Sequence, residues 1–159
     1  MSAAALAELL EELAAAPLGL RRACAAVGAD ELRRRPAPDQ FSPLENAWHL
    51  RDIEVEGYAP RIAKILTADR PDLASLDGDR MAVERRYNEL ELAAALDGFS
   101  QARLANVCRL CAAGPAEFAR RATLEGRSLD LAGLVAAMVE HDRGHLSAVR
   151  GAHAPSLAA

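Results

Sequence analysis

The sequence predicts an all-α protein folded as a four-helix bundle, and three observations carry this prediction. Hydrophobic residues make up 51% of the 159-residue chain, yet only 4% of residues are aromatic, and alanine and leucine dominate. Alanine, leucine, glutamate and arginine are strong helix formers. Four segments repeat apolar residues at helical spacing, and no segment shows the alternation typical of a strand. The length suits one domain, residues 1–159, with a helical core over about 5–151 and a disordered tail over about 152–159.

The first two predicted helices cover residues 2–27 and about 42–67. Leucines recur at helical spacing along the first one, and Pro17 is expected to kink or break it because proline lacks the N–H that the helix needs. The second helix begins with "SPLE", which is a capping box. In this motif Ser42 caps the helix, proline fills the first helical position, and Glu45 reaches back to the capping residue.

The remaining two helices are predicted over about 82–113 and 129–151. The segment 69–80 is rich in Asp, Pro and Gly, so it is expected to be a loop, and it is long enough for a crossover connection. "EGRS", residues 125–128, is expected to be a turn, and Ser128 is expected to cap the last helix. Four long amphipathic helices in one domain favour a bundle.

Charge and cysteine content exclude several classes of protein. The net charge is −4 with acidic and basic residues interspersed, which argues against a nucleic-acid-binding surface. The N-terminal segment carries glutamates and is neither a signal peptide nor a membrane span. An odd number of cysteines points to the reducing cytoplasm. Cys108 and Cys111 form a C-x-x-C without a second pair, so they and Cys24 are expected to be small buried apolar residues.

The pattern "EHDRGH" places His141 and His145 four residues apart in the last helix. Residues at this spacing point only about 40° apart, so the two imidazoles share a helix face. Leu134, Met138 and Val149 lie on nearly the same face, which directs the pair into the bundle. Such a pair can bind a metal ion through both imidazoles. The acidic residues around it do not match the zincin motif H-E-x-x-H. The alternative is two buried or rim histidines that bond to protein or water.

His49 is the candidate for a third ligand. It lies about two turns into the second helix, at a depth that matches the histidine pair if the second and fourth helices are antiparallel neighbours. Its position on the helix wheel leaves two alternatives, a solvated face or a polar cleft. Its neighbours on the wheel are Glu45, Asp52, Ile53 and Glu56, and it points away from the apolar stripe of Leu44, Trp48, Val55, Ile62 and Leu66.

Two helix acids have two interpretations each. Asp52 and Asp142 could orient ligand imidazoles, or they could be exposed helix acids. Gly144 lies in the middle of a helix, where it costs about 1 kcal/mol relative to alanine, and it could leave room for a close helix, ligand or substrate. Glu45 is explained by the capping box.

Three segments together resemble the DinB-like (DinB/YfiT) superfamily of bacterial four-helix bundles. They are "RRPAPDQFSPLENAWHLRDIE" (34–54), "LDGDRMAVERRYNELELAAALDGFSQAR" (76–103) and "LVAAMVEHDRGHLSAVR" (134–150). The resemblance extends over most of residues 5–150. It implies an up-up-down-down bundle, which is commonly a homodimer. It also implies a divalent metal, usually nickel or zinc, on one histidine of the second helix and an H-x-x-x-H of the fourth. The matching positions are His49, His141 and His145, and the resemblance favours the cleft for His49.

Three neutral imidazoles leave coordination positions open, as in catalytic rather than structural sites. The resemblance to thiol-dependent transferases predicts transfer of a low-molecular-weight thiol. Metal-assisted hydrolysis is the alternative reaction, with Asp52 or Glu56 as a candidate general base. A non-catalytic module that senses or stores a metal or ligand is the third interpretation. Neither nucleic acid nor a membrane is an expected partner.

Overall fold

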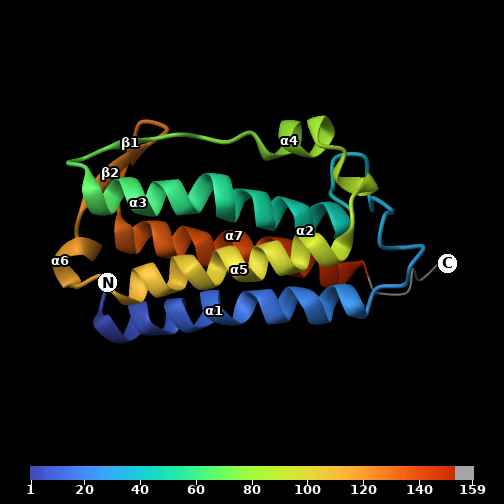
Figure 1. The fold of residues 1–159 in the computed structure, drawn as a ribbon, viewed down its shortest axis with the longest axis horizontal. Coiled ribbons are helices and arrows are strands. Elements are labelled where there is room, and N and C mark those ends of the chain that lie inside the picture. The colour runs from blue at the N-terminus through green and yellow to red at the C-terminus, as the bar shows by residue number, and fades with distance from the viewer. Residues whose placement is uncertain (153–159) are drawn as a thin grey trace.

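The computed structural model describes residues 1–152, which form four long helical rods lying side by side (Figure 1). The all-α four-helix bundle predicted from the sequence is confirmed. Pro17 lies inside the first rod, which continues through it, so the expected break is not found. Except for Ala152, the predicted tail and His153 lie outside the described residues. The rods are α1 (Ala3–Ala25), a composite of α2 (Pro43–Asp52), the π-helix η1 (Ile53–Tyr58) and α3 (Ala59–Thr67), then α5 (Leu92–Cys111) and α7 (Leu131–Gly151).

The rods run up, down, down and up, which corrects the up-up-down-down order implied by the family resemblance. In Figure 1, α1 and α7 run in one direction, and α2–α3 and α5 run in the other. Contacts agree, because His49 of α2 meets His141 of α7, and Asn46 meets His145, as in antiparallel neighbours. The first connection reverses the chain at one end of the bundle. The connection between α3 and α5 instead runs back along the bundle, so these two rods are parallel.

A small sheet, absent from the sequence prediction, joins the two long connections. The predicted turn at 125–128 is the hairpin turn of this sheet, where Glu125 and Gly126 both have positive φ, as a type I′ turn requires. Strands of two to four residues are too short to show a detectable alternation in the sequence. The strands are β1 (Asp72–Leu73), β2 (Arg121–Leu124) and β3 (Arg127–Asp130), with β1 parallel and β3 antiparallel to β2.

Two predicted helix boundaries are wrong. The helix predicted over 82–113 is divided, because Arg86 has a left-handed φ of 55° that an α-helix excludes. The predicted cap Ser128 lies in β3, and Asp130 caps α7 by accepting a hydrogen bond from Gly133 N at 2.7 Å. The connections also contain α4 (Gly78–Glu84), the 3₁₀ turn η2 (Tyr87–Glu89) and α6 (Pro115–Phe118).

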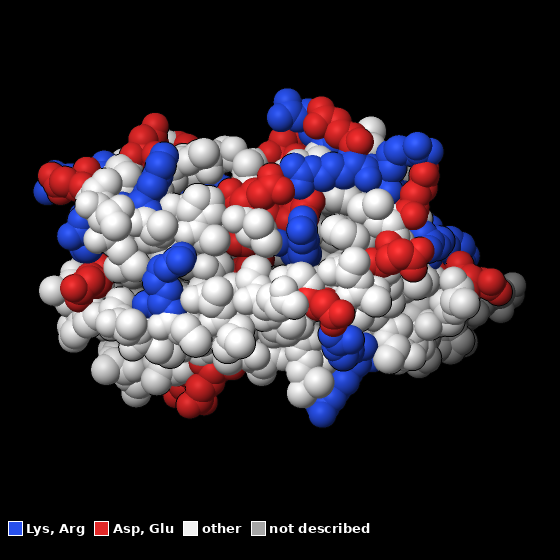
Figure 2. Space-filling model, viewed as in Figure 1, with Lys and Arg blue, Asp and Glu red and all other residues white. Residues whose placement is uncertain are grey.

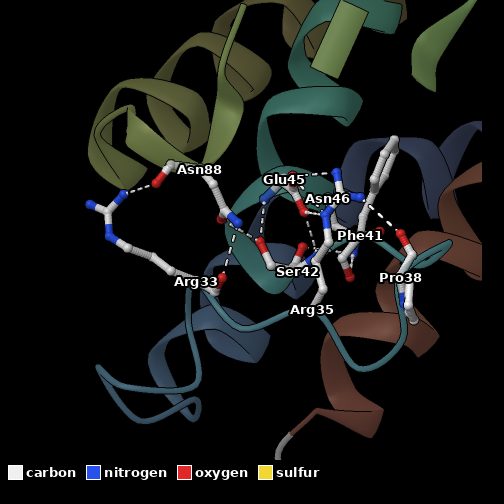
Figure 3. A network of polar contacts seen from close by, with 8 residues as sticks. All are labelled: Arg33, Arg35, Pro38, Phe41, Ser42, Glu45, Asn46 and Asn88. Carbon is white, nitrogen blue, oxygen red and sulfur yellow. Dashed lines mark hydrogen bonds and ion pairs between the residues drawn. The ribbon is translucent and has the colours of Figure 1, made fainter. Parts of the chain in front are cut away.

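The predicted capping box is confirmed at the start of α2, where it lies inside a larger polar network (Figure 3). The Ser42 Oγ accepts a hydrogen bond from Glu45 N at 3.1 Å, and the Glu45 carboxylate accepts one from Ser42 N at 2.8 Å. Arg35 donates to the same carboxylate at 2.6 Å, and the Ser42 hydroxyl donates to Asn88 at 2.7 Å. The network therefore anchors the start of α2, and His49 follows in the last turn of this helix.

The core is formed mainly by aliphatic side chains, and most charged residues lie interspersed on the surface (Figure 2). Cys24 is buried as expected, but Cys108 and Cys111 are exposed, so their predicted burial is wrong. They lie on the outer side of α5, whose inward positions are taken by residues such as Asn106 and Leu110. Within residues 1–152, none of the helices has the length and hydropathy to cross a membrane.

Candidate metal centre

Three histidine side chains from two rods converge near one end of the bundle. The Nε2 atoms of His49 on α2 and His141 on α7 lie 3.0 Å apart. The His145 ring centroid lies 4.4 Å from that of His49 and 4.5 Å from that of His141. One nitrogen from each ring lies within 4.8 Å of the other two. The structure therefore brings together the three histidines that the sequence predicted as ligands.

The burial of His49 decides between the two alternatives that helical periodicity left open. Its side chain is only 8% exposed, because α2 is packed between α5 and α7 and is covered on its outer side by α4 and η2. Helix α2 is buried on most sides and not along the single stripe that a helix wheel predicts. The π-helix then widens the turn after α2, and Val55 of the predicted stripe is exposed.

Asn46 and two aromatic residues hold the imidazole rings in place. The Asn46 Oδ1 lies 2.7 Å from Nδ1 of His145, which leaves Nε2 of that ring for the cluster. Phe41 packs against His49 with ring centroids 5.3 Å apart, and Tyr58 meets His141 edge-on at 5.8 Å. Sequence reasoning missed all three residues. Asn46 could have been found from its position one helical turn before His49.

Gly78 at the start of α4 is a further residue that sequence reasoning missed. A Cβ atom at this position would lie 2.8 Å from Nδ1 of His49 and still closer to Cε1. The backbone of α4 therefore packs directly on the imidazole edge, which only glycine allows. The sequence does not indicate this contact with His49, because Gly78 falls in a segment rich in loop-forming residues.

Burial keeps two of the imidazoles neutral. Desolvation, followed by the neighbouring His145 and His141, lowers the pKa of His49 to about 3. Desolvation, followed by His141, lowers the pKa of His145 to about 4. A neutral imidazole retains the lone pair that a metal ion needs, so both rings are in the ligand form at neutral pH.

Two hollows open onto the histidines. The larger one has a volume of about 710 Å³ and contains Asp79 and Glu140 on its wall. The smaller one, of about 460 Å³, reaches the same rings past Tyr58 and Arg61. Phe41, Asp79, His141 and His145 line both hollows, so small molecules can approach the cluster from solvent.

Asp52 and Glu56, the predicted general-base candidates, form ion pairs away from the cluster. Asp52 is buried and accepts hydrogen bonds from Arg51 and Arg85, both at 2.5 Å, and from the Tyr87 hydroxyl at 2.7 Å. Glu56 accepts two hydrogen bonds from Arg85 at 2.6 and 2.9 Å. Since these arginines occupy both carboxylates, the geometry does not support either residue as a base or, for Asp52, as an orienting group.

Asp142 and Gly144 lie closer to the predicted centre. Asp142 is buried, and its Oδ1 lies 3.7 Å from Nδ1 of His141. Gly144 lines the larger hollow, and a Cβ added there would meet no described atom within 4 Å. The space beside Gly144 is therefore open on the side of the hollow rather than filled by a neighbouring helix.

Known proteins share this architecture. A family model described as "DinB superfamily" matches residues 12–149. The chain belongs to the DinB superfamily. A solved structure described as "YfiT from Bacillus subtilis is a probable metal-dependent hydrolase with an unusual four-helix bundle topology" matches this DinB-superfamily chain with a TM-score of 0.89. The match has 15% sequence identity and covers 96% of this chain and 87% of that one, so it shows the shared fold alone. No curated protein matches the chain.

Proposed function

We propose that this DinB-superfamily protein binds one divalent metal ion, nickel or zinc, through His49, His141 and His145. We propose further that it uses this ion to transfer a low-molecular-weight thiol to a small electrophile. The observation that carries the proposal is the convergence of three imidazoles, from rods far apart in sequence, beside a cleft of about 710 Å³. Metal-dependent hydrolysis is the probable activity of YfiT itself, and it supports only the use of a metal here.

The donor set fits such an ion. Nitrogen ligands lie about 2.0–2.1 Å from zinc, so two ligands of a tetrahedral site are roughly 3.3 Å apart. The 3.0 Å separation of the His49 and His141 Nε2 atoms is close to this value, and the third nitrogen is within reach. Imidazole ligands suit both nickel and zinc. Three protein ligands leave at least one position open, as catalytic sites require.

Residues of the chain orient the ligand rings and leave space for the reactants. A divalent ion lowers the pKa of a thiol or water that coordinates it. Asn46 fixes the orientation of His145, and Phe41 and Tyr58 pack against the rings of His49 and His141. The larger hollow has room for both a thiol and an electrophile. Coordination alone deprotonates a thiol, so thiol transfer does not need Asp52 or Glu56 as a base.

Hydrolysis is the second candidate function, and Asp79 and Glu140 favour it. Both carboxylates line the larger hollow beside the histidines, where either could accept a proton from an attacking water. Glu140 also lies 3.4 Å from Arg143, which leaves Asp79 as the less constrained of the two.

Metal analysis of the purified protein tests the site. Protein produced in metal-supplemented medium should carry about one divalent ion per chain. His141→Ala should abolish this binding, while His153→Ala, a histidine outside the predicted triad, should leave it unchanged. Equal metal content in the two variants would contradict the assignment.

A substrate screen then tests the reaction. The metal-loaded protein would be incubated with several bacterial thiols and small electrophiles, and separately with esters and amides without thiol. Thiol-dependent product supports transfer, and thiol-independent cleavage supports hydrolysis. Metal binding without turnover in either panel would favour the non-catalytic binding module.

We also propose that the protein is a cytoplasmic homodimer that pairs through α1 and α5. Leu18 and Leu104 are 52% and 65% exposed there and line a groove of about 340 Å³. Figure 2 shows few charged side chains over these two helices. Three free cysteines are consistent with a reducing compartment.

Analytical ultracentrifugation tests the dimer. The Leu104→Glu variant should be monomeric, whereas Val83→Glu, at a residue of α4 that is 70% exposed, should remain dimeric. A wild-type monomer at all concentrations would contradict the dimer.

A further inference from the structure

A buried ion cluster lies between the four rods next to the histidines. Arg103 of α5 is only 1% exposed. Its guanidinium donates to Glu54 of the π-helix at 2.8 Å, to Asp142 of α7 at 2.5 and 3.2 Å, and to the carbonyl oxygen of Leu13 in α1 at 3.1 Å. Asn106 donates to the second oxygen of Glu54 at 2.8 Å. The Arg103 cluster (Arg103, Glu54, Asp142 and Asn106) thus joins all four rods.

Stability alone does not account for this cluster. Transferring charges from water into a protein interior costs free energy that their mutual attraction often only offsets, and apolar replacements are frequently as stable. Here two buried carboxylates share one buried guanidinium, which leaves an excess negative charge in the interior. An arrangement of this kind is better explained if the second carboxylate interacts with another group.

The position of Asp142 identifies that group as His141. The Asp142 Oδ2 has the short 2.5 Å bond to Arg103, whereas Oδ1 has only the long 3.2 Å bond and lies 3.7 Å from Nδ1 of His141. Within the described residues, this buried Nδ1 has no hydrogen-bond partner. The opposite nitrogen of the same ring, Nε2, points to His49. The imidazole therefore lies between the carboxylate and the place where three ring nitrogens meet.

We propose that Arg103 holds Asp142 so that the Asp142 Oδ1 accepts a hydrogen bond from Nδ1–H of His141, which presents Nε2 of that ring as the metal ligand. The inference rests on the proposed function. Asp142 and Arg103 are positioning residues, since they act through His141. A shortening of less than about 1 Å brings Oδ1 and Nδ1 to hydrogen-bond distance. Carboxylate partners of this kind fix the tautomer of a ligand histidine and raise its basicity.

Two matched substitutions separate positioning from a structural role. Asp142→Asn and Glu54→Gln each remove one carboxylate charge from Arg103 and leave the other, so each leaves a single buried ion pair. Both should change the melting temperature to a similar degree. Only Asp142 faces His141, so Asp142→Asn should weaken Zn²⁺ binding about 10- to 100-fold, whereas Glu54→Gln should change it less than threefold.

Zn²⁺ affinity would be measured on the metal-free full-length protein by competition with a chromophoric chelator, and Co²⁺ absorption spectra would report ligand geometry. The spectrum should change in Asp142→Asn and match the wild type in Glu54→Gln. Equal affinities and equal spectra in the two variants would overturn the inference while leaving the three-histidine site intact.

A second variant covers the case in which Asp142→Asn does not fold. Arg103→Lys keeps the charge but loses the planar fork that holds both oxygens of Asp142, so Zn²⁺ affinity should fall at least threefold. Unchanged affinity in this variant would also overturn the inference. If the wild-type protein binds neither Zn²⁺ nor Co²⁺ through its histidines, the proposed function fails together with this inference.

Discussion

Replacing Gly78 with alanine should displace His49 and weaken the three-histidine site. The new Cβ would lie 2.8 Å from Nδ1 of His49, whereas ordinary van der Waals contacts begin near 3.4 Å, so the ring or the start of α4 must move by more than 0.6 Å. The ring has little space to move, because its side chain is only 8% exposed and Phe41 packs against it. Overpacking of this kind costs about 1–3 kcal/mol of unfolding free energy.

Two assays measure the effect. Urea unfolding of the metal-free protein should show the loss of about 1–3 kcal/mol. Zn²⁺ affinity should fall by about tenfold or more, because ligands displaced by more than about 0.5 Å no longer match the productive geometry. Gly144→Ala on the other wall of the site is the control, since its Cβ meets no described atom within 4 Å.

The control should gain about 1 kcal/mol from the higher helix propensity of alanine. A Gly78→Ala protein with wild-type stability and wild-type Zn²⁺ affinity would refute the reasoning, because it would mean that α4 does not press on His49.

Three further predictions concern the scaffold. Pro17→Ala should raise the unfolding free energy by up to about 3 kcal/mol in urea titrations, because α1 continues through a residue that cannot complete its hydrogen bonds; a loss of stability would contradict the uninterrupted helix. Ser42→Ala should lower the melting temperature through a loss of about 1–2 kcal/mol from the capping box, and an unchanged value would argue against that role. In the Leu104→Glu monomer, a thiol-labelling reagent should modify Cys108 and Cys111 at once but Cys24 only on unfolding, because burial shields Cys24 and raises its pKa to about 11; three fast thiols would contradict this burial.

Features that depend on neighbouring residues could be read from the sequence. The "SPLE" motif determined the start of α2, because a capping box involves only residues three apart. Apolar spacing predicted the bounds of α1 and α7 to within a few residues. The shared face of His141 and His145 followed from helix geometry alone. Helix α5 was less well defined, because the left-handed residue Arg86 and the turn that follows it separate α5 from α4 and leave no mark in the hydrophobic pattern.

Features that join distant segments required the tertiary structure. His49 and His141 are 92 positions apart in the sequence. The family resemblance, and not helical periodicity, predicted that they share a site. Their rings come together only through the packing of α2 against α7. The same packing placed Gly78 against His49, gave His145 its partner Asn46, and tied Asp52 and Glu56 to arginines away from the cluster. Spacing along one helix fixes which side chains share a face, because the helix repeat is constant. Which faces meet depends on the burial of all four rods together, and only the folded bundle decides that.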